Sequence, residues 1–338
     1  MRTFDYFRAD SVERALLART QTDAVYLAGG TTLLDLMKLD VMRPARVVDI
    51  HKLRLDRIER LNDGRVRVGA MVTNTNLARD DVIRAAYPVL LEALLSGAST
   101  QLRNKATTAG NIMQRVRCGY FRDGISPCNK RSPGAGCAAV GGQNRNVHAV
   151  LGGSENCFAA HPSDMCVAMA AIGATIHVQG VRGVREIDFL DFHLLPGNTP
   201  WKEHALAEGE MITHVTLDAP IAGSRSAYLK LRDRASYQFA LASCAAILTF
   251  EGQTITNARL ALGGVGTRPW RALAAERLLI GQRASTDVFT QAAATALDGA
   301  RSFGQNGFKI ALGQQAVVRN LTTIAARPHA DIDENGRA

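Results

Sequence analysis

The 338-residue sequence has no long hydrophobic run. No apolar stretch reaches the roughly 18–20 residues that a membrane-spanning helix needs, so we expect no membrane span. The first 17 residues contain no apolar segment after a basic one, which argues against a secretory signal. We therefore expect a cytoplasmic protein, or a periplasmic one if a partner subunit with its own signal exports both chains together.

The sequence also lacks a clustered basic segment, although its net charge is +9. Lysines and arginines are scattered, with no lysine-rich arm and no interleaved aromatic stripe, so nucleic-acid binding is not expected. An acidic partner protein or anionic cofactors explain the charge more simply. There is no GxSxG motif, and no GxGxxG motif between a strand and a helix. Because no nucleophile–base–acid set is visible, we expect no catalytic residue here and a bound cofactor that supplies the chemistry.

Cysteines with short, paired spacing are missing too, yet four of the six cysteines fall within forty residues. They are Cys118, Cys128, Cys137 and Cys157, spaced C-x9-C-x8-C-x19-C. Thiolate sulfur favours iron–sulfur clusters or zinc, and structural zinc sites usually show closely spaced pairs. Disulfides are rare in a chain that folds in the cytoplasm. We therefore favour an iron–sulfur cluster, with zinc, disulfides or free thiols as the alternatives.

Several residues around these cysteines have expected supporting roles. The negative charge of a cluster can be offset by nearby cations, which are Arg115, Arg117, Lys130, Arg131 and Arg145. Cys166 and Cys244 stand in apolar stretches, where a buried thiol behaves as a small hydrophobic side chain. His148 and His161 each stand alone, so we expect ordinary hydrogen-bonded histidines.

A glycine pair follows an early strand signal. Residues Ala24–Ala28 (AVYLA) predict a buried strand, Gly29–Thr32 (GGTT) follow, and a helix is expected from Leu33. Paired glycines let a ligand approach the backbone, and the free N–H groups at a helix start suit a pyrophosphate. The alternative is a tight strand-to-helix turn with a threonine cap.

Two further segments combine the residue types of a cofactor-binding loop. Arg103–Asn111 (RNKATTAGN) joins glycine to side-chain hydrogen-bond donors and can wrap a dinucleotide, although a loop with Asn and Thr turns is the alternative. His161–Asp164 (HPSD) starts a helix. Asp164 can accept a hydrogen bond from a ribityl hydroxyl, or it can simply cap that helix.

In this order, the three segments resemble the FAD-binding subunit of the xanthine dehydrogenase and aldehyde oxidoreductase family, the molybdenum hydroxylases, which includes carbon monoxide dehydrogenase medium subunits. The resemblance runs over nearly the whole chain and extends to Tyr228–Arg232 and Ala258–Arg271. It implies an α+β fold. A two-subdomain FAD-binding domain of the vanillyl-alcohol oxidase (PCMH) type would span 1–220, as subdomains 1–57 and 58–220. A C-terminal α+β domain like that of carbon monoxide dehydrogenase flavoproteins would span 224–327, followed by a flexible tail at 328–338. The implied FAD contacts are Leu27, Ala28, Gly29, Gly30, Thr31, Thr32, Leu33, Leu34, Thr107, Thr108, Ala109, Gly110, Asn111, Ser163, Asp164, Ile212 and Lys230.

The cysteine segment departs from the plain family pattern, in which the second flavin segment runs directly into the Ser163–Asp164 helix. Residues 115–157 resemble the insertion that holds a [4Fe–4S] cluster in the FAD subunit of bacterial PaoABC-type aldehyde oxidoreductases, most specifically at Cys128–Cys137 (CNKRSPGAGC). The resemblance implies that Cys118, Cys128, Cys137 and Cys157 are the cluster ligands.

The same resemblance implies an electron-transfer subunit of a heterotrimer that oxidises aldehydes to carboxylic acids. A large molybdopterin subunit would carry out the oxidation, a small subunit would carry two [2Fe–2S] clusters, and FAD in this chain would pass electrons to an external acceptor. The alternatives are the FAD subunit of another molybdenum hydroxylase (for xanthine, carbon monoxide or N-heterocycles), a stand-alone FAD reductase, and a zinc-stabilised binding module.

Overall fold

The computed structural model describes residues 1–20 and 23–327 of the chain. The tail predicted at 328–338 lies outside the described residues. None of the helices in the described ranges is both long and apolar enough to cross a membrane.

The N-terminal part contains a small parallel sheet. Its strands are β1 (Asp5–Arg8), β2 (Ala24–Leu27) and β3 (Arg46–Asp49), in the order β1–β3–β2. Helix α1 (Val12–Thr20) connects β1 to β2, and α2 (Leu33–Lys38) connects β2 to β3. The predicted strand, glycine turn and helix are therefore confirmed, and the glycine turn leaves the carboxyl end of β2.

A five-stranded antiparallel sheet follows. Its order is β4 (Ile58–Arg60), β5 (Val66–Gly69), β8 (Met211–Leu217), β6 (Ala174–Gly180) and β7 (Gly183–Asp188). Side chains alternate along strand β5, where Val66 and Val68 are buried while Arg67 is exposed. The helices that accompany this sheet are α3 (Asn74–Arg79), α4 (Asp81–Ala86), α5 (Pro88–Ser96), α6 (Thr100–Arg103), α7 (Thr108–Ile112), α8 (Gly119–Arg122), α9 (Asp164–Ile172) and α10 (Phe189–Phe192).

Helix α9 forms the centre of the largest hydrophobic core. All nine of its residues are buried, which explains why its sequence DMCVAMAAI is apolar on every face. Ser163 caps its first turn, and Gly173 ends it with a φ of +89°. The helix packs on α5 and on the C-terminal sheet, so it connects the flavin-type motifs to the rest of the core.

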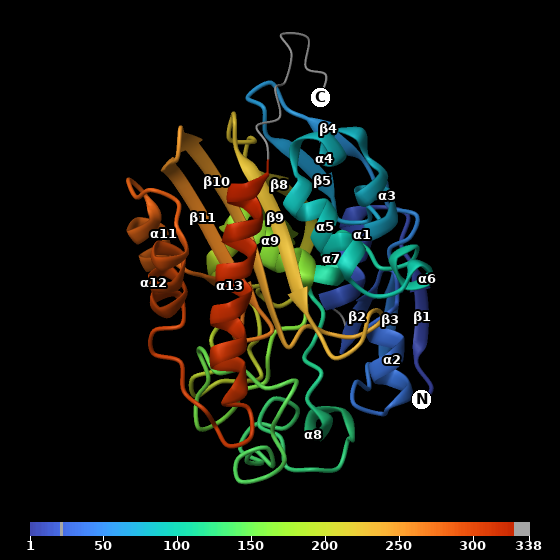
Figure 1. Ribbon diagram of the computed structural model, residues 1–338. Helices are drawn as coiled ribbons and strands as arrows, with labels where there is room; N and C mark the ends of the chain where they lie inside the picture. The colour runs from blue at the N-terminus through green and yellow to red at the C-terminus, as the bar shows by residue number, and fades with distance from the viewer. Residues whose placement is uncertain (21–22, 328–338) are drawn as a thin grey trace.

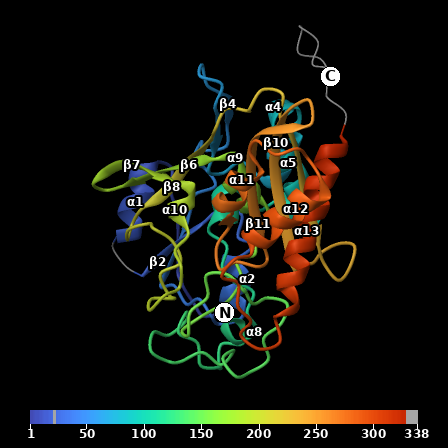
Figure 2. The same cartoon turned by 60° about the vertical axis from the view of Figure 1, so that its left-hand side comes forward.

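The C-terminal sheet is antiparallel, in the order β12 (Trp270–Arg271), β11 (Thr254–Gly263), β10 (Ala242–Glu251) and β9 (Arg225–Leu231). Helices α11 (Leu273–Leu279), α12 (Thr286–Ala296) and α13 (Phe308–Ala326) cover one face of it, whereas α5 and α9 cover the other (Figures 1 and 2). The cysteine segment is mostly irregular and lies at the lower end of the molecule in Figure 1.

Lys309, at the start of α13, joins that helix to the cysteine segment. Its side chain is fully buried, and its ammonium donates hydrogen bonds to the carbonyl oxygens of Asn146, His148 and Gly264. Burial lowers the pKa of Lys309 to about 7. The three carbonyl acceptors satisfy all three donors of the ammonium, so this lysine serves as a structural bond between two distant segments.

Candidate functional site

The glycine turn between β2 and α2 lies against the main chain of the second motif. Gly30 has a φ of +74°, a conformation that favours glycine. A Cβ atom on Gly29 would lie 1.8 Å from the carbonyl oxygen of Lys105. The side chain of Thr32 makes no capping hydrogen bond to α2, so the alternative of a threonine cap is wrong. The turn instead brings two segments that are far apart in the sequence into direct contact.

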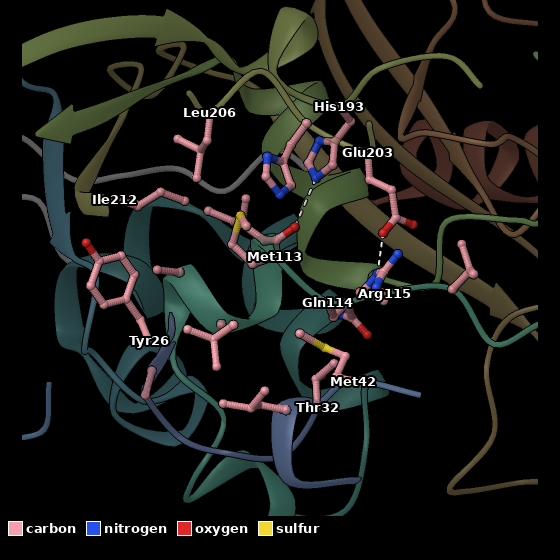
Figure 3. A pocket seen from close by; sticks show the side chains of 18 of the residues that line it. Tyr26, Thr32, Met42, Met113, Gln114, Arg115, His193, Glu203, Leu206 and Ile212 are labelled. Carbon is pink, nitrogen blue, oxygen red and sulfur yellow. Dashed lines mark hydrogen bonds and ion pairs between the residues drawn. The ribbon is translucent and has the colours of Figure 1, made fainter. Parts of the chain in front are cut away.

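A cavity of about 540 Å³ opens beside this turn. Its size is within the range of about 300–1,000 Å³ that is usual for ligand pockets. In Figure 3, His193, Glu203 and Arg115 approach from one side, and Thr32 and Met42 lie on the opposite side. The predicted FAD contacts that line this main cavity are Ala28, Gly29, Gly30, Thr31, Thr32, Leu33, Thr107, Ala109, Gly110 and Ile212.

The predicted contacts Leu27, Leu34, Thr108 and Asn111 are not among the residues that line the main cavity. The buried hydroxyl of Thr108 donates to the carbonyl oxygen of Val72 at 3.1 Å. The side-chain oxygen of Asn111 accepts a hydrogen bond from Ser163 at 2.7 Å. The side chains of Leu27 and Leu34 lie against Gly30. These four residues hold the wall of the cavity in place and do not form its surface.

Ser163 and Asp164 line a second, smaller cavity of about 170 Å³. Asp164 forms a buried ion pair with Lys230, with 2.8 Å between Oδ2 and Nζ, and accepts a hydrogen bond from the hydroxyl of Tyr228 at 2.6 Å. Burial, together with the negative charge of Asp164, raises the pKa of Tyr228 well above its ordinary value, so the hydroxyl remains a donor. The structure thus pairs Lys230 with Asp164, which lines the smaller cavity, and their contact with a flavin stays a prediction.

His161 lines both cavities and therefore marks the place where they meet. Its Nδ1 accepts a hydrogen bond from the backbone N–H of Ser163 at 3.4 Å, which leaves the ring proton on Nε2. Ligating atoms of His161, Cys166 and His193 lie within 4.8 Å of one another. Burial lowers the pKa of His161, so we interpret the trio as a neutral polar contact within the core.

The four cysteines of the segment surround one small cavity. Cys118, Cys128 and Cys157 are buried, Cys137 is partly buried, and all four thiols are free. An isolated β-bridge pairs Cys128 with Cys137. Burial raises the pKa of Cys118 to about 11, so this thiol is protonated at neutral pH unless a bound metal stabilises the thiolate. Cys166 and Cys244 lie elsewhere in the core and are fully buried, as the sequence predicted.

The main cavity and the cysteine cavity share a wall. Val116, Lys130, Cys157 and Ala159 line both of them. One side chain of the cysteine quartet therefore borders the space that the glycine turn encloses. A ligand in the main cavity would be separated from the four thiols by no more than this layer of side chains.

Two family descriptions match the chain in sequence. The FAD-binding domain in molybdopterin dehydrogenase matches residues 2–220, and the carbon monoxide dehydrogenase flavoprotein C-terminal domain matches residues 226–322. The chain belongs to this family of molybdopterin dehydrogenase flavoproteins. The resemblance inferred from the sequence motifs is confirmed, and so is the expected α+β fold class.

The chain is similar to individual members of this flavoprotein family over nearly its full length. It is 47% identical over 334 residues to the aldehyde oxidoreductase FAD-binding subunit PaoB of Escherichia coli (strain K12), covering 98% of this chain and 99% of that one. It is 28% identical over 331 residues to the carbon monoxide dehydrogenase medium chain of Hydrogenophaga pseudoflava, covering 96% and 98%. A solved structure of carbon monoxide dehydrogenase from the same organism superposes with a TM-score of 0.76 at 26% identity, covering 96% of this chain and 98% of that one.

In this flavoprotein, Glu203 is a site residue that no sequence motif marks. Its carboxylate pairs with Arg115 at 2.5 Å and with Lys130 at 2.8 Å, and it lines the main cavity. Burial alone would raise the pKa of Glu203, but the two cations outweigh burial and lower it. Glu203 therefore stays charged and ties the cysteine segment to the cavity wall. It lies in an irregular segment far in sequence from both partners, so local patterns could not reveal it.

Proposed function

We propose that this chain is the FAD- and [4Fe–4S]-carrying electron-transfer subunit of a heterotrimeric molybdenum-dependent aldehyde oxidoreductase. Its partners are a large molybdopterin-binding subunit and a small subunit with [2Fe–2S] clusters. The observation that carries the proposal is the likeness to PaoB, which extends from end to end and includes the cysteine segment. The likeness to carbon monoxide dehydrogenase medium chains, which is weaker, supports the flavoprotein part in general.

The main cavity suits the pyrophosphate of FAD, and the smaller cavity suits its ribityl chain. The glycine turn and the neighbouring Thr31 and Thr32 give the main cavity a close main-chain approach and hydroxyl donors suited to a pyrophosphate. The smaller cavity, which meets the main one at His161, offers Asp164 to a ribityl hydroxyl. We propose that FAD spans both cavities and that residues 1–220, as subdomains 1–57 and 58–220, form its binding domain beside a C-terminal domain at 224–327.

The thiols of the cysteine segment fit a [4Fe–4S] cluster better than zinc. Four sulfurs on one tetrahedral zinc, with bonds of about 2.3 Å, would lie about 3.8 Å apart. In the described ranges, the trio of metal-ligating side chains found within 4.8 Å includes none of Cys118, Cys128, Cys137 and Cys157. A [4Fe–4S] cluster binds each thiolate through a different iron atom and therefore needs wider spacing.

The shared wall supports an electron path between the cluster and the flavin. When bound, FAD supplies the redox chemistry by taking up electrons and releasing them to an external acceptor. Cys157 borders both cavities, and Lys130 beside it keeps a positive charge at the boundary. Lys130 and Arg115, held by Glu203, offset the negative charge of a four-thiolate cluster. The buried apolar Val116 and Ala159 keep water away from this boundary.

Metal and flavin analysis of the purified full-length chain tests the proposal. The wild type should hold about four iron and four sulfide per chain together with FAD. Cys128→Ser should lose most of the iron while FAD stays bound, because Cys128 does not line the main or the smaller cavity. Cys244→Ser is the matched control, since Cys244 is buried in β10 and does not line the cysteine cavity, and the iron content of this variant should equal that of the wild type.

The possible results separate the alternatives. Zinc in place of iron, with flavin present, would leave a molybdenum hydroxylase flavoprotein with a structural metal. FAD and iron without co-purification of molybdopterin and [2Fe–2S] subunits from the native host would favour a stand-alone reductase. Oxidation of xanthine or an N-heterocycle, and not of aldehydes, by the native complex would assign it to another branch of the family.

A further inference from the structure

Arg117 is a cation of the cysteine segment that forms no ion pair with a carboxylate in the part of the chain that the structure describes. Its guanidinium donates hydrogen bonds to the carbonyl oxygen of Arg115 at 3.1 Å and to the side chain of Gln114 at 3.2 Å. It also lies 4.8 Å from the ring centroid of Phe239. Only two of its five N–H donors are used in these bonds. A guanidinium that is partly withdrawn from water in this way is suited to bind an electron-rich group.

Arg117 lines the smaller cavity, and three other side chains around the same space have an unpaired polar atom. One is Nε2 of His161, which carries the ring proton and is a donor. The others are Oε1 of Gln238, which is an acceptor, and the hydroxyl oxygen of Ser243. Phe239 adds an aromatic surface. These groups come from the cysteine segment, the start of α9 and the β9–β10 connection with the start of β10, so three separate parts of the chain converge on one cavity.

This set of groups matches the edge of a flat heterocycle on which carbonyl oxygens alternate with an N–H group. The donors Arg117 and His161 suit the carbonyl oxygens, and the acceptor Gln238 suits the N–H group. The isoalloxazine ring of FAD has such an edge. A dinucleotide whose pyrophosphate lies at the glycine turn can extend into this cavity past His161, which lines both spaces.

We propose that Arg117 is the contact through which the cysteine segment recognises the flavin ring and sets its affinity and reduction potential. The inference rests on the proposed function, because it requires FAD in the two cavities. Arg117 directly precedes Cys118 in the sequence. The same short piece of chain therefore contributes a thiol to the cysteine cavity and a cation to the ring cavity.

The charge of Arg117 explains why it would influence the potential as well as the affinity. Full reduction of the ring at neutral pH takes up two electrons from the reductant and one proton from the solvent, so the ring gains one negative charge. A fixed cation at its polar edge stabilises that charge in a partly dehydrated site. Arg117 should therefore bind the reduced ring more tightly than the oxidised one.

The test is a comparison of Arg117→Met with Arg145→Met in the full-length chain. Arg145 is the matched control, because it lies in the same segment and stacks on Phe308 but lines none of the three cavities. FAD affinity is measured by titrating flavin into the flavin-depleted chain. The midpoint potential is measured by reductive titration with dithionite, which supplies the electrons. Arg117→Met should weaken binding of oxidised FAD about tenfold and of reduced FAD about a hundredfold. The extra factor of ten equals a fall of about 30 mV in the two-electron midpoint potential.

Iron content and thermal unfolding accompany these measurements. Arg117→Lys keeps the positive charge but loses the planar guanidinium, so its midpoint potential should stay close to that of the wild type while FAD binds less tightly. This variant also replaces Arg117→Met in the test if the methionine variant does not fold. Wild-type affinity and potential in Arg117→Met would overturn the inference while leaving the proposed function intact. Equal losses in Arg145→Met would also overturn it, because the effect would then come from the whole segment. A wild-type chain that binds no flavin would overturn both proposals.

Discussion

Gly29→Ala should separate the two main-chain segments that enclose the main cavity. The added Cβ would lie 1.8 Å from the carbonyl oxygen of Lys105, whereas ordinary contacts begin at 3.4 Å. The two segments would therefore have to move apart by about 1.6 Å, and no flexible side chain is available to absorb the shift. Overpacking of this kind costs about 1–3 kcal/mol. If about 3 kcal/mol falls on the cofactor-binding conformation, FAD affinity falls about a hundredfold.

Gly30→Ala and Gly252→Ala show whether the loss is specific to that contact. At Gly30 the new Cβ meets only the tips of Leu27 and Leu34, so the main cost is the positive φ, about 1–2 kcal/mol. At Gly252 the φ is +59° and no atom lies within 4 Å, so stability should fall by about 1–2 kcal/mol without any effect on flavin.

The assay for all three glycine variants is the flavin released per chain on denaturation, combined with the Kd from flavin titration and the temperature of unfolding. If Gly29→Ala keeps full flavin occupancy and a normal Kd, the close approach of the two segments is not what shapes the site, and this reasoning is refuted.

Three other predictions concern buried charges. Asp164→Asn leaves the ammonium of Lys230 buried without its partner and should cost about 3–5 kcal/mol in urea unfolding, and the added change Lys230→Met should recover part of that loss. Lys309→Met leaves three carbonyl oxygens without their hydrogen-bond donor, so it should lower the free energy of unfolding by at least about 3 kcal/mol. Limited proteolysis should then cut the cysteine segment faster than in the wild type. Cleavage at the wild-type rate would contradict this role of Lys309. Burial lowers the pKa of His193 to about 4, below the ordinary value near 6.5, so the unfolded chain binds the extra proton. Its contribution to the free energy of unfolding is present above pH 6.5 and is lost as the pH falls toward 4, with a slope of up to about 1.4 kcal/mol per pH unit. His193→Asn should therefore flatten the curve of unfolding free energy against pH. An unchanged curve would exclude the effect.

Local signals in the sequence predicted the elements that position the site. The glycine pair after a buried strand and the polar start of α9 depend on residues within a few positions of one another. Capping and hydrophobic periodicity act over that range, so the sequence alone could reveal them. The placement of Gly29 through Thr32 along one cavity followed from the same signals.

Tertiary contacts account for what the sequence could not predict. Strand β8 inserts between β5 and β6 although it follows β6 in the chain, and no local pattern specifies that order. The pairing of Glu203 with Arg115 spans 88 positions. Thr108 and Asn111 match a cofactor motif, yet their side chains bond to other protein groups because the backbone turns them away from the cavity. Residue type is visible in a sequence, but the direction of a side chain depends on packing.

The bond between Lys309 and the cysteine segment affects the order in which the protein matures. Lys309 belongs to α13, the last helix among the residues that the structure describes, and its three acceptors lie in or beside the residues that carry Cys118 through Cys157. During synthesis, those residues leave the ribosome well before α13 exists. We therefore expect the four thiols to come together only after α13 has been synthesised, so that the proposed cluster would be assembled after that helix has formed.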